Sequence, residues 1–286
     1  MNSYYLHSIN KAIDYIENNF DKKIKLEDVA SISNFSKYHF HRIFKSIVNE
    51  TLNDYIKRIR LEKAIRQLMS LPEKAIKDIA MDCGYDNPAN FSRDFQNKYN
   101  KTPLQVREDK KIPPMGISTD KNLPPIELSE VKFIPSKKLV YKRISDGYNS
   151  HTIRPAFEEL YYFAEENNIS SQIENYVGIG YDDPDVTSPD KCRYDAGFIV
   201  PENTQISVPE KFNQKSICNE LYAMFFFEGK VHEFKSAWDL VFKNWLIKSD
   251  YVPLNLPHME LYLYSEKHEL GIYKAYLCIP VEPIKK

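Results

Sequence analysis

A repeat in the first third of the chain constrains its fold more than any other feature. Phe40–Thr51 and Phe91–Thr102 share a Phe, an Arg, a second Phe, an Asn and a Thr at the same spacing. An apolar residue followed by alanine precedes each copy, as Val29-Ala30 and as Ile79-Ala80. One pair of helices does not account for two copies, so the sequence predicts two similar helical units in succession.

The first copy has the features of a helix-turn-helix unit. Apolar residues recur at intervals of three and four, which predicts helices over residues 10–20, 26–30 and 37–48. Asn34 suits the left-handed backbone of a tight turn, and Ser36 is a favourable N-cap for the helix that follows. Phe35 and Phe40 flank that cap and are expected to pack against each other.

The second copy repeats these features with a turn that is one residue longer, Gly84-Tyr85-Asp86. Asn87 is expected to cap its last helix, and Pro88 takes the first helical position, which proline favours. Residues 51–71 are predicted to form one long helix that joins the two copies. Two such units on a rigid connector can enter successive major grooves on one face of DNA, about 34 Å apart.

These residues resemble the AraC/XylS family of transcription regulators. The most specific match is the second copy, with the pattern Gly84-Tyr85, Phe91, Arg93, Phe95, Thr102-Pro103 and Arg107. The resemblance covers residues 5–108. It implies an all-α domain of seven helices that contains two helix-turn-helix units and binds double-stranded DNA as a bipartite reader.

The resemblance also assigns DNA-contacting positions by their place in each unit. In the first unit, Tyr38, His41 and Arg42 would face base edges, while Lys37 and Lys45 are better placed for phosphates. In the second unit, the base-facing residues would be Pro88, Ala89, Asn90, Ser92 and Arg93. The relatives often carry longer polar side chains at the first two of these positions, so the second unit is expected to read fewer bases. Phosphate contact is the alternative role for Arg42 and Arg93.

Composition and charge agree with a DNA-binding part that is joined to a different part. The net charge is −1, but residues 1–111 hold an excess of Lys and Arg, while residues 112–286 hold an excess of Asp and Glu. No apolar run approaches the ~18 residues of a membrane span, and the N-terminus is too polar for a signal peptide, so a cytoplasmic protein is expected. The four cysteines form no CxxC pair, and neither a metal nor a cofactor is expected.

The chain is expected to divide into a DNA-binding domain at 1–110, a linker at 111–125 and a second domain at 126–286. Four prolines around Gly116 indicate the linker. Beyond it, the pattern predicts strands over residues 139–144, 176–181, 197–200, 222–227, 259–264 and 273–279, and helices near 153–167 and 233–248. Similar residues recur in the two halves, so the predicted fold class is multidomain, with an α+β C-terminal domain of two strand–helix–strand–strand repeats. A groove between the halves would suit a ligand.

This second domain resembles the GyrI-like effector-binding domains found behind AraC-type and MerR-type DNA-binding domains. The resemblance covers residues 126–284. It rests on Ile134-Pro135, Gly147, Gly178–Pro184, Arg193–Gly197, Trp245-Leu246 with Ser249, Glu260–Tyr262 and Cys278–Val281. It implies that the domain binds a small molecule.

Glu260 is the strongest candidate for contact with that molecule. Strand alternation puts Glu260, Tyr262 and Tyr264 on one face and Met259 and Leu261 on the other, which is expected to lie beneath the helices. A carboxylate among aromatic rings can receive a flat organic cation by charge pairing and cation–π contact, and the resemblance implies a glutamate in this role. The alternative is a solvated glutamate on an edge strand. Further candidates are Tyr148, Tyr181, Tyr222 and Trp238.

The sequence therefore favours a sequence-specific DNA-binding transcription regulator that binds a small effector and is not an enzyme. The resemblance implies an activator that works with RNA polymerase. Two alternatives stay open, namely hydrolysis of a small reactive compound by the second domain, and a constitutive regulator whose second domain binds a protein. The sequence offers no His/Ser or metal apparatus for hydrolysis, and a catalytic glutamate would need a raised pKa.

Overall fold

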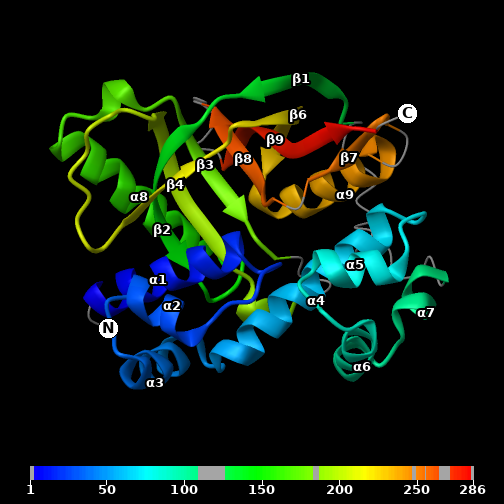
Figure 1. Ribbon diagram of the computed structural model, residues 1–286. Helices are drawn as coiled ribbons and strands as arrows, with labels where there is room; N and C mark the ends of the chain where they lie inside the picture. Colours follow the sequence, from blue (N-terminus) through cyan, green and yellow to red (C-terminus); the bar gives the residue numbers. More distant parts are fainter. Residues whose placement is uncertain are drawn as a thin grey trace. The chain divides into compact units, whose positions relative to one another are not determined.

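The computed structural model describes residues 3–108, 126–182, 187–246, 249–254, 256–263 and 271–284. The chain divides into two compact units, Met1–Pro113 and Pro114–Lys286 (Figure 1). The expected linker at 111–125 lies outside the described residues.

The described part of the N-terminal unit is helical throughout. Its helices are α1 (Ser3–Asn18), α2 (Leu26–Ile32), α3 (Lys37–Val48), α4 (Leu52–Ser70), α5 (Ile76–Asp82), α6 (Pro88–Tyr99) and α7 (Pro103–Glu108). The pairs α2–α3 and α5–α6 form the two helix-turn-helix units, and α4 joins them. The long connecting helix that the sequence predicts is confirmed.

The ends of these helices follow the predicted turn and cap residues. Asn34 has a φ of 57°, and the Ser36 hydroxyl accepts a hydrogen bond from the backbone N–H of His39 at 3.3 Å. In the second unit the Asn87 side chain accepts one from the backbone N–H of Ala89 at 2.8 Å. The asparagines that the two copies share, Asn49 and Asn100, end α3 and α6 in the left-handed conformation.

The phenylalanines of the repeat form the cores of the two units. Phe40 and Phe44 are fully buried in the first unit, with Phe44 edge-on to Tyr55 of α4 at a centroid distance of 5.5 Å. Phe91 and Phe95 take the same places in the second unit. Because these positions point inward, the intervening positions of α3 and α6 point to solvent.

The C-terminal unit is a curled antiparallel sheet with two long helices. Its strands are β1 (Leu128–Ile134), β2 (Lys137–Ile144), β3 (Asn175–Gly180), β4 (Tyr194–Pro201), β5 (Asn213–Ile217), β6 (Glu220–Lys230), β7 (Tyr251–Pro253), β8 (His258–Leu263) and β9 (Ile272–Pro283). The helices are α8 (Ser150–Glu166) and α9 (Phe234–Asn244). The six predicted strands are present, whereas β1, β5 and β7 were not predicted.

The strand order explains why the sheet curls. The hydrogen-bonded order is β1-β6-β9-β8-β3-β4-β2-β5, with β7 paired to β9. The pair β1–β6 ends with Ile134 opposite Glu220, and the pair β2–β5 begins with Lys137 opposite Ile217. The two pairs therefore share one continuous antiparallel register. Strands at opposite ends of the order are thus joined by short connections, and the sheet must bend back on itself.

Curling gives the sheet two buried sides. Val140, Phe198 and Leu160 of α8 pack together on the outer side, and α9 packs on the other half of that side. The inner side buries residues such as Tyr141, Ile199, Met259 and Leu261. The expectation that Met259 and Leu261 lie beneath the helices is therefore wrong, because they belong to the inner side of the curl.

Candidate DNA-binding helices and candidate ligand site

The outward side of α3 carries the residues expected to contact DNA. Lys37, His41, Arg42 and Lys45 are all exposed, and a surface hollow of about 360 Å³ is lined by His41, Arg42, Lys45 and Ser46. Tyr38 belongs to α3, but its side chain lies outside the described part. The helix thus presents cationic and hydrogen-bonding groups on the side opposite its buried phenylalanines.

Lys37 already has a partner within the unit. Its ammonium forms an ion pair and a hydrogen bond with Glu27 of α2. The hydrogen bond from Lys37 lowers the pKa of Glu27. Both side chains are exposed, so the pair is weak, and Lys37 can exchange Glu27 for a phosphate at little cost.

The second helix-turn-helix unit presents a smaller polar surface on α6. Ala89, Asn90 and Arg93 are exposed, while Pro88 and Ser92 are half-buried. Arg93 occupies the position in α6 that Arg42 occupies in α3, so the two guanidinium groups are equivalent in the repeat. The proline serves here as the first residue of the helix rather than as a polar contact.

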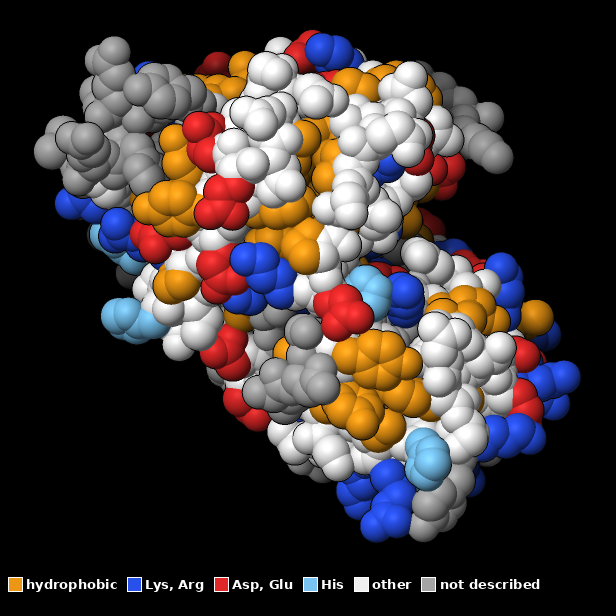
Figure 2. All heavy atoms as spheres, turned by 90° about the vertical axis from the view of Figure 1, so that its left-hand side faces the viewer, with side chains coloured by type: hydrophobic (Ala, Val, Ile, Leu, Met, Phe, Trp, Pro, Cys, Tyr) orange, Lys and Arg blue, Asp and Glu red, His pale blue; other side chains and the backbone are white. Residues whose placement is uncertain are grey.

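Exposed hydrophobic side chains also gather on the surface of the N-terminal unit. Tyr4, Tyr5 and Leu6 at the start of α1 are exposed, and the Tyr5 ring stacks on Phe35 at 5.9 Å. Figure 2 shows patches of hydrophobic side chains (orange) on the surface, with Lys and Arg side chains (blue) nearby. Phe35 packs against the buried cluster that contains Phe40.

In the C-terminal unit, three neutral donors hold the carboxylate of Glu260. Its Oε2 accepts hydrogen bonds from the hydroxyls of Tyr262 at 2.7 Å and Tyr194 at 3.0 Å. Its Oε1 accepts one from the indole N–H of Trp238 at 3.1 Å. The donors come from β8, β4 and α9, so the tertiary fold assembles the site.

Gly178 makes the contact from Tyr194 possible. It lies on β3 directly opposite Glu260, between β8 and β4. A Cβ on this residue would lie 1.7 Å from the Tyr194 hydroxyl and 2.9 Å from Glu260 Oε2. The phenol of Tyr194 therefore crosses β3 through space that only a glycine leaves open.

Aromatic rings from both helices surround this carboxylate. The Tyr262 ring lies edge-on to Phe157 of α8 at a centroid distance of 5.5 Å and 6.0 Å from Phe234 of α9. The Trp238 ring lies 5.4 Å from His258. Contact with both helices puts Glu260 and Tyr262 on the outer side of the sheet, beneath the helices. The sequence predicted the opposite side.

Burial changes the acidity of the groups in this site. It raises the pKa of Glu260, and the hydrogen bonds from Tyr262, Trp238 and Tyr194 oppose this shift. Burial and the neighbouring carboxylate raise the pKa values of Tyr194 and Tyr262 well above the usual range. The tyrosines therefore stay neutral, and any ionised form of the site has its negative charge on Glu260. As whole residues, Glu260, Tyr262 and Trp238 are half-buried.

The structure brings together some of the other expected ligand-binding residues but not all. Tyr148 lies beside Tyr194, with a centroid distance of 6.0 Å, and its hydroxyl accepts a hydrogen bond from the backbone N–H of Asp182. Tyr181 and Tyr222 belong to the inner side, away from Glu260. Tyr264 lies outside the described residues. Tyr194 was missed, because only its pairing across Gly178 shows that it reaches the carboxylate.

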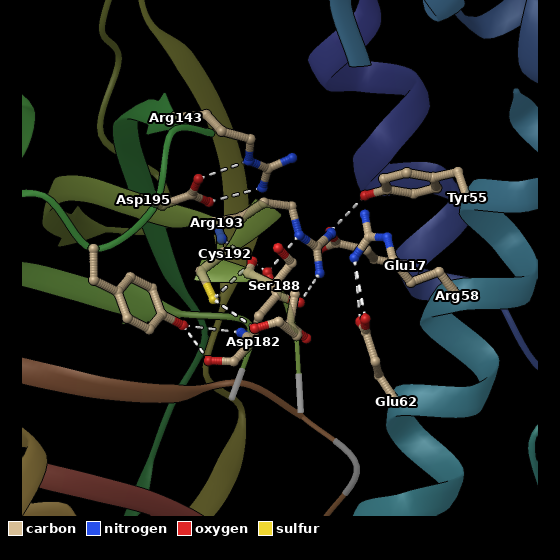
Figure 3. Close-up of polar contacts among 12 residues, drawn as sticks. Glu17, Tyr55, Arg58, Glu62, Arg143, Asp182, Ser188, Cys192, Arg193 and Asp195 are labelled. Carbon is tan, nitrogen blue, oxygen red and sulfur yellow. Dashed lines mark hydrogen bonds and ion pairs between the residues drawn. The ribbon is translucent and has the colours of Figure 1, made fainter. Parts of the chain in front are cut away.

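A second polar cluster stabilises the inner side of the same sheet. Arg143 forms a bidentate ion pair with Asp195 at 2.7 and 2.9 Å (Figure 3). Lys215 and the Tyr181 hydroxyl also contact that carboxylate. Burial alone would raise the pKa of Asp195, but Arg143 and Lys215 outweigh it and lower the pKa. In contrast to Glu260, this buried carboxylate is paired with cations.

The described ranges of the chain hold neither a side-chain cluster suited to a metal ion nor a membrane-spanning helix. Within those ranges, His, Cys, Asp and Glu side chains do not gather into a group of three that could bind a metal ion. No helix in the same ranges is both long enough and apolar enough to cross a membrane.

Comparison with known proteins agrees with this division into two units. Residues 129–282 match the family of the GyrI-like small molecule binding domain, and residues 29–109 match a helix-turn-helix domain. Over 99 residues the chain is 36% identical to the regulatory protein SoxS of Escherichia coli K12, an alignment that covers 35% of this chain and 92% of SoxS.

Two further relatives match part of this chain. AdaA of Bacillus subtilis, a bifunctional transcriptional activator and DNA repair enzyme, is 39% identical over 99 residues, which make up 35% of this chain and 46% of AdaA. The solved C-terminal domain of AraT, a response regulator from Geobacillus stearothermophilus, is 31% identical, with a TM-score of 0.35, and covers 37% of this chain and 87% of the AraT domain.

The GyrI-like match covers more than half of the chain, and the helix-turn-helix match covers most of the remainder. The chain is therefore an AraC-family DNA-binding transcription regulator whose C-terminal unit belongs to the GyrI-like small molecule binding domain family.

Proposed function

We propose that this regulator is controlled by an organic cation with an aromatic ring system, which binds at Glu260. The observation that carries this proposal is the chemistry of the carboxylate. Within the described part of the chain its hydrogen-bond donors are the neutral groups of Tyr262, Tyr194 and Trp238. Neutral donors solvate a buried charge without cancelling it, so a cation would gain from the site.

The surrounding rings favour an aromatic cation over a small hydrated ion. Tyr262 and Trp238 both contact the carboxylate, and the His258 ring lies 5.4 Å from the Trp238 ring. A flat cation can stack on such faces and gain from both cation–π attraction and the burial of apolar surface. A small inorganic cation would lose its hydration shell and gain only the carboxylate.

The position of Glu260 in the sheet also supports a ligand site. Glu260 and Gly178 are directly opposite each other in the central pair of strands, β8 and β3. The strand order runs outward from this pair as β9 and β6 on one side and β4 and β2 on the other, as an internal two-fold repeat would require. Such a repeat would place Glu260 and Gly178 next to its two-fold axis. The glutamate would provide the charge there, and the glycine would leave space beside it.

Titration calorimetry with a matched pair of compounds tests the ligand proposal. The cation 1-methylquinolinium and the neutral 1-methylnaphthalene have nearly the same shape, so they differ mainly in charge. The full chain should prefer the cation, Glu260→Gln should lose that preference, and Glu130→Gln, a change at an exposed position of β1, should keep it. Equal affinity of wild type and Glu260→Gln for the cation would refute the proposal.

We further propose that α3 and α6 read DNA in two successive major grooves and that the protein activates transcription with RNA polymerase. In the first unit, Arg42, His41 and Tyr38 would face bases, while Lys37 and Lys45 would contact phosphates. In the second unit, Asn90 and Arg93 would supply most of the specificity. The similarity to the transcriptional activator AdaA supports the role as an activator.

Selection of binding sites from random duplexes, followed by footprinting, tests the DNA proposal. One chain should protect a bipartite site without inverted symmetry, because each chain carries two reading units. Binding should weaken steeply with salt, because phosphate contacts release counterions. An inverted repeat that requires two chains would refute this proposal.

A further inference from the structure

A chain of alternating charges crosses the N-terminal unit from one helix-turn-helix to the other. Arg58 of α4 donates from Nε and from one terminal nitrogen to Glu50, just beyond α3, at 3.0 and 2.8 Å. Its other terminal nitrogen contacts Glu62, one turn along α4, at 3.2 Å (Figure 3). Glu62 also accepts from Lys98 of α6 at 3.0 Å. Both recognition helices are thus tied to the connecting helix by charged groups.

These four side chains are too buried to be an ordinary surface network. The side chains of Arg58, Glu50 and Glu62 are 10%, 9% and 4% exposed, and that of Lys98 is 26% exposed. Burial lowers the pKa of Lys98, and Glu62 opposes this shift. Moving such charges out of water costs about as much as their attraction returns, and apolar residues of similar volume often give equal stability.

Stability alone therefore does not account for the charge chain. A role in holding the helices at fixed angles does. A guanidinium that binds two carboxylates through different nitrogens accepts a narrow range of angles, whereas apolar side chains accept many. The best-documented role of buried polar and ionic groups is to select one arrangement of helices among several. Here they lie where α3, α4 and α6 must be held at one angle.

Arg60 provides a second connection between the two helix-turn-helix units. Its guanidinium donates to the backbone carbonyls of Phe20 and Lys22, which follow α1, at 2.7 Å in each case. The turn of the second unit lies against the same group, since a Cβ on Gly84 would lie 2.7 Å from the Phe20 carbonyl oxygen and 2.9 Å from Arg60 Cζ. Gly84 has a φ of 78° and leaves space for this approach.

We infer that the charge chain Glu50–Arg58–Glu62–Lys98, with Arg60, fixes the separation and angle of the recognition helices and so determines which spacing between half-sites the protein accepts. The inference rests on the proposed two-groove reading of DNA. Successive major grooves on one face repeat about every ten base pairs, and one added base pair also rotates the second half-site around the helix. A rigid pair of helices should reject such a change, whereas a flexible pair should tolerate it.

The test compares the full chain with a variant in which the whole charge chain is neutral. Glu50→Gln, Arg58→Met, Glu62→Met and Lys98→Met are combined, so that no charge is left buried alone, and the melting temperature checks the fold. Dissociation constants are measured for the site selected by the wild type and for sites with one base pair added or removed from the spacer. Lys74→Met with Asp82→Asn, which removes an ion pair within the second unit, is the matched control.

The wild type and the control should discriminate strongly against altered spacing, and the neutral variant should discriminate about tenfold less. Lys98→Met alone removes the most exposed of the four charged side chains and leaves Arg58 paired with Glu62. It therefore provides a second variant that should fold. It should show the same loss of discrimination. Wild-type discrimination in Lys98→Met, or a uniform loss of affinity at every spacing, would overturn the inference. A wild-type site that is not bipartite would instead overturn the proposed mode of DNA reading.

Discussion

Gly178→Ala tests the geometry of the ligand site most severely. The new Cβ would lie 1.7 Å from the Tyr194 hydroxyl and 2.5 Å from Tyr194 Cζ, so the buried phenol must leave its place. Forcing a group into a packed core costs about 1–3 kcal/mol. Loss of the hydrogen bond from Tyr194 to the carboxylate costs about 1.5–3 kcal/mol more. The free energy of unfolding of the C-terminal unit should therefore fall by about 2.5–6 kcal/mol.

Urea unfolding followed by tryptophan fluorescence measures this change specifically in the C-terminal unit. The chain has two tryptophans, Trp238 and Trp245, and both belong to the C-terminal unit. Gly271→Ala is the control, because its Cβ would meet no atom of the described residues within 4 Å and its φ of 71° adds the strain of the left-handed region, about 1–2 kcal/mol.

A double-mutant cycle then identifies the cause. Tyr194→Ala removes the ring that the new Cβ would strike, so Gly178→Ala should cost much less in that background. If Gly178→Ala is no more destabilising than Gly271→Ala, or if the two substitutions are additive, the close packing of Tyr194 over Gly178 is refuted.

Three further predictions follow from the sites described above. Arg42→Ala should weaken DNA binding by about 1–3 kcal/mol at one base position of the first half-site, measured by competition with point-changed duplexes, and a uniform loss would make Arg42 a phosphate contact. Because burial raises the pKa of Glu260, affinity for 1-methylquinolinium should fall as the pH drops through that raised value and the carboxyl becomes neutral. Calorimetry across a pH series checks this, and a cation affinity that does not change with pH would contradict it. Ser36→Ala should destabilise the N-terminal unit by about 1 kcal/mol through loss of its N-cap, measured by circular dichroism, whereas Ser46→Ala, within α3, should change little.

The N-terminal unit could be predicted closely because its signals are local. Asn34, Ser36, Asn87 and Pro88 each act within three residues of their own position, so turn and cap rules apply without knowledge of the tertiary structure. The contacts of Arg58 with Glu50 and of Glu62 with Lys98, in contrast, join α4 to residues outside that helix and leave no periodic pattern in the sequence.

The ligand site could be predicted only in part, because a curled sheet buries both of its sides. Alternation along β8 correctly grouped Glu260 with Tyr262, but it does not say which side the helices cover. The predicted side was wrong for this reason. Tyr194 was missed because its role depends on Gly178, a residue in a different strand. The edge strands lack the usual alternation, because the residues of β1 are mostly exposed and those of β5 are mostly polar.

The most direct test of an effector-controlled regulator is transcription in vitro from a promoter that carries the selected DNA site. Bacterial RNA polymerase and the full chain are combined, and 1-methylquinolinium or 1-methylnaphthalene is added. The cation should change the transcript yield with wild type and with Glu130→Gln, while Glu260→Gln should bind the same DNA and not respond. If Glu260→Gln responds to the cation as the wild type does, control of this regulator does not pass through Glu260.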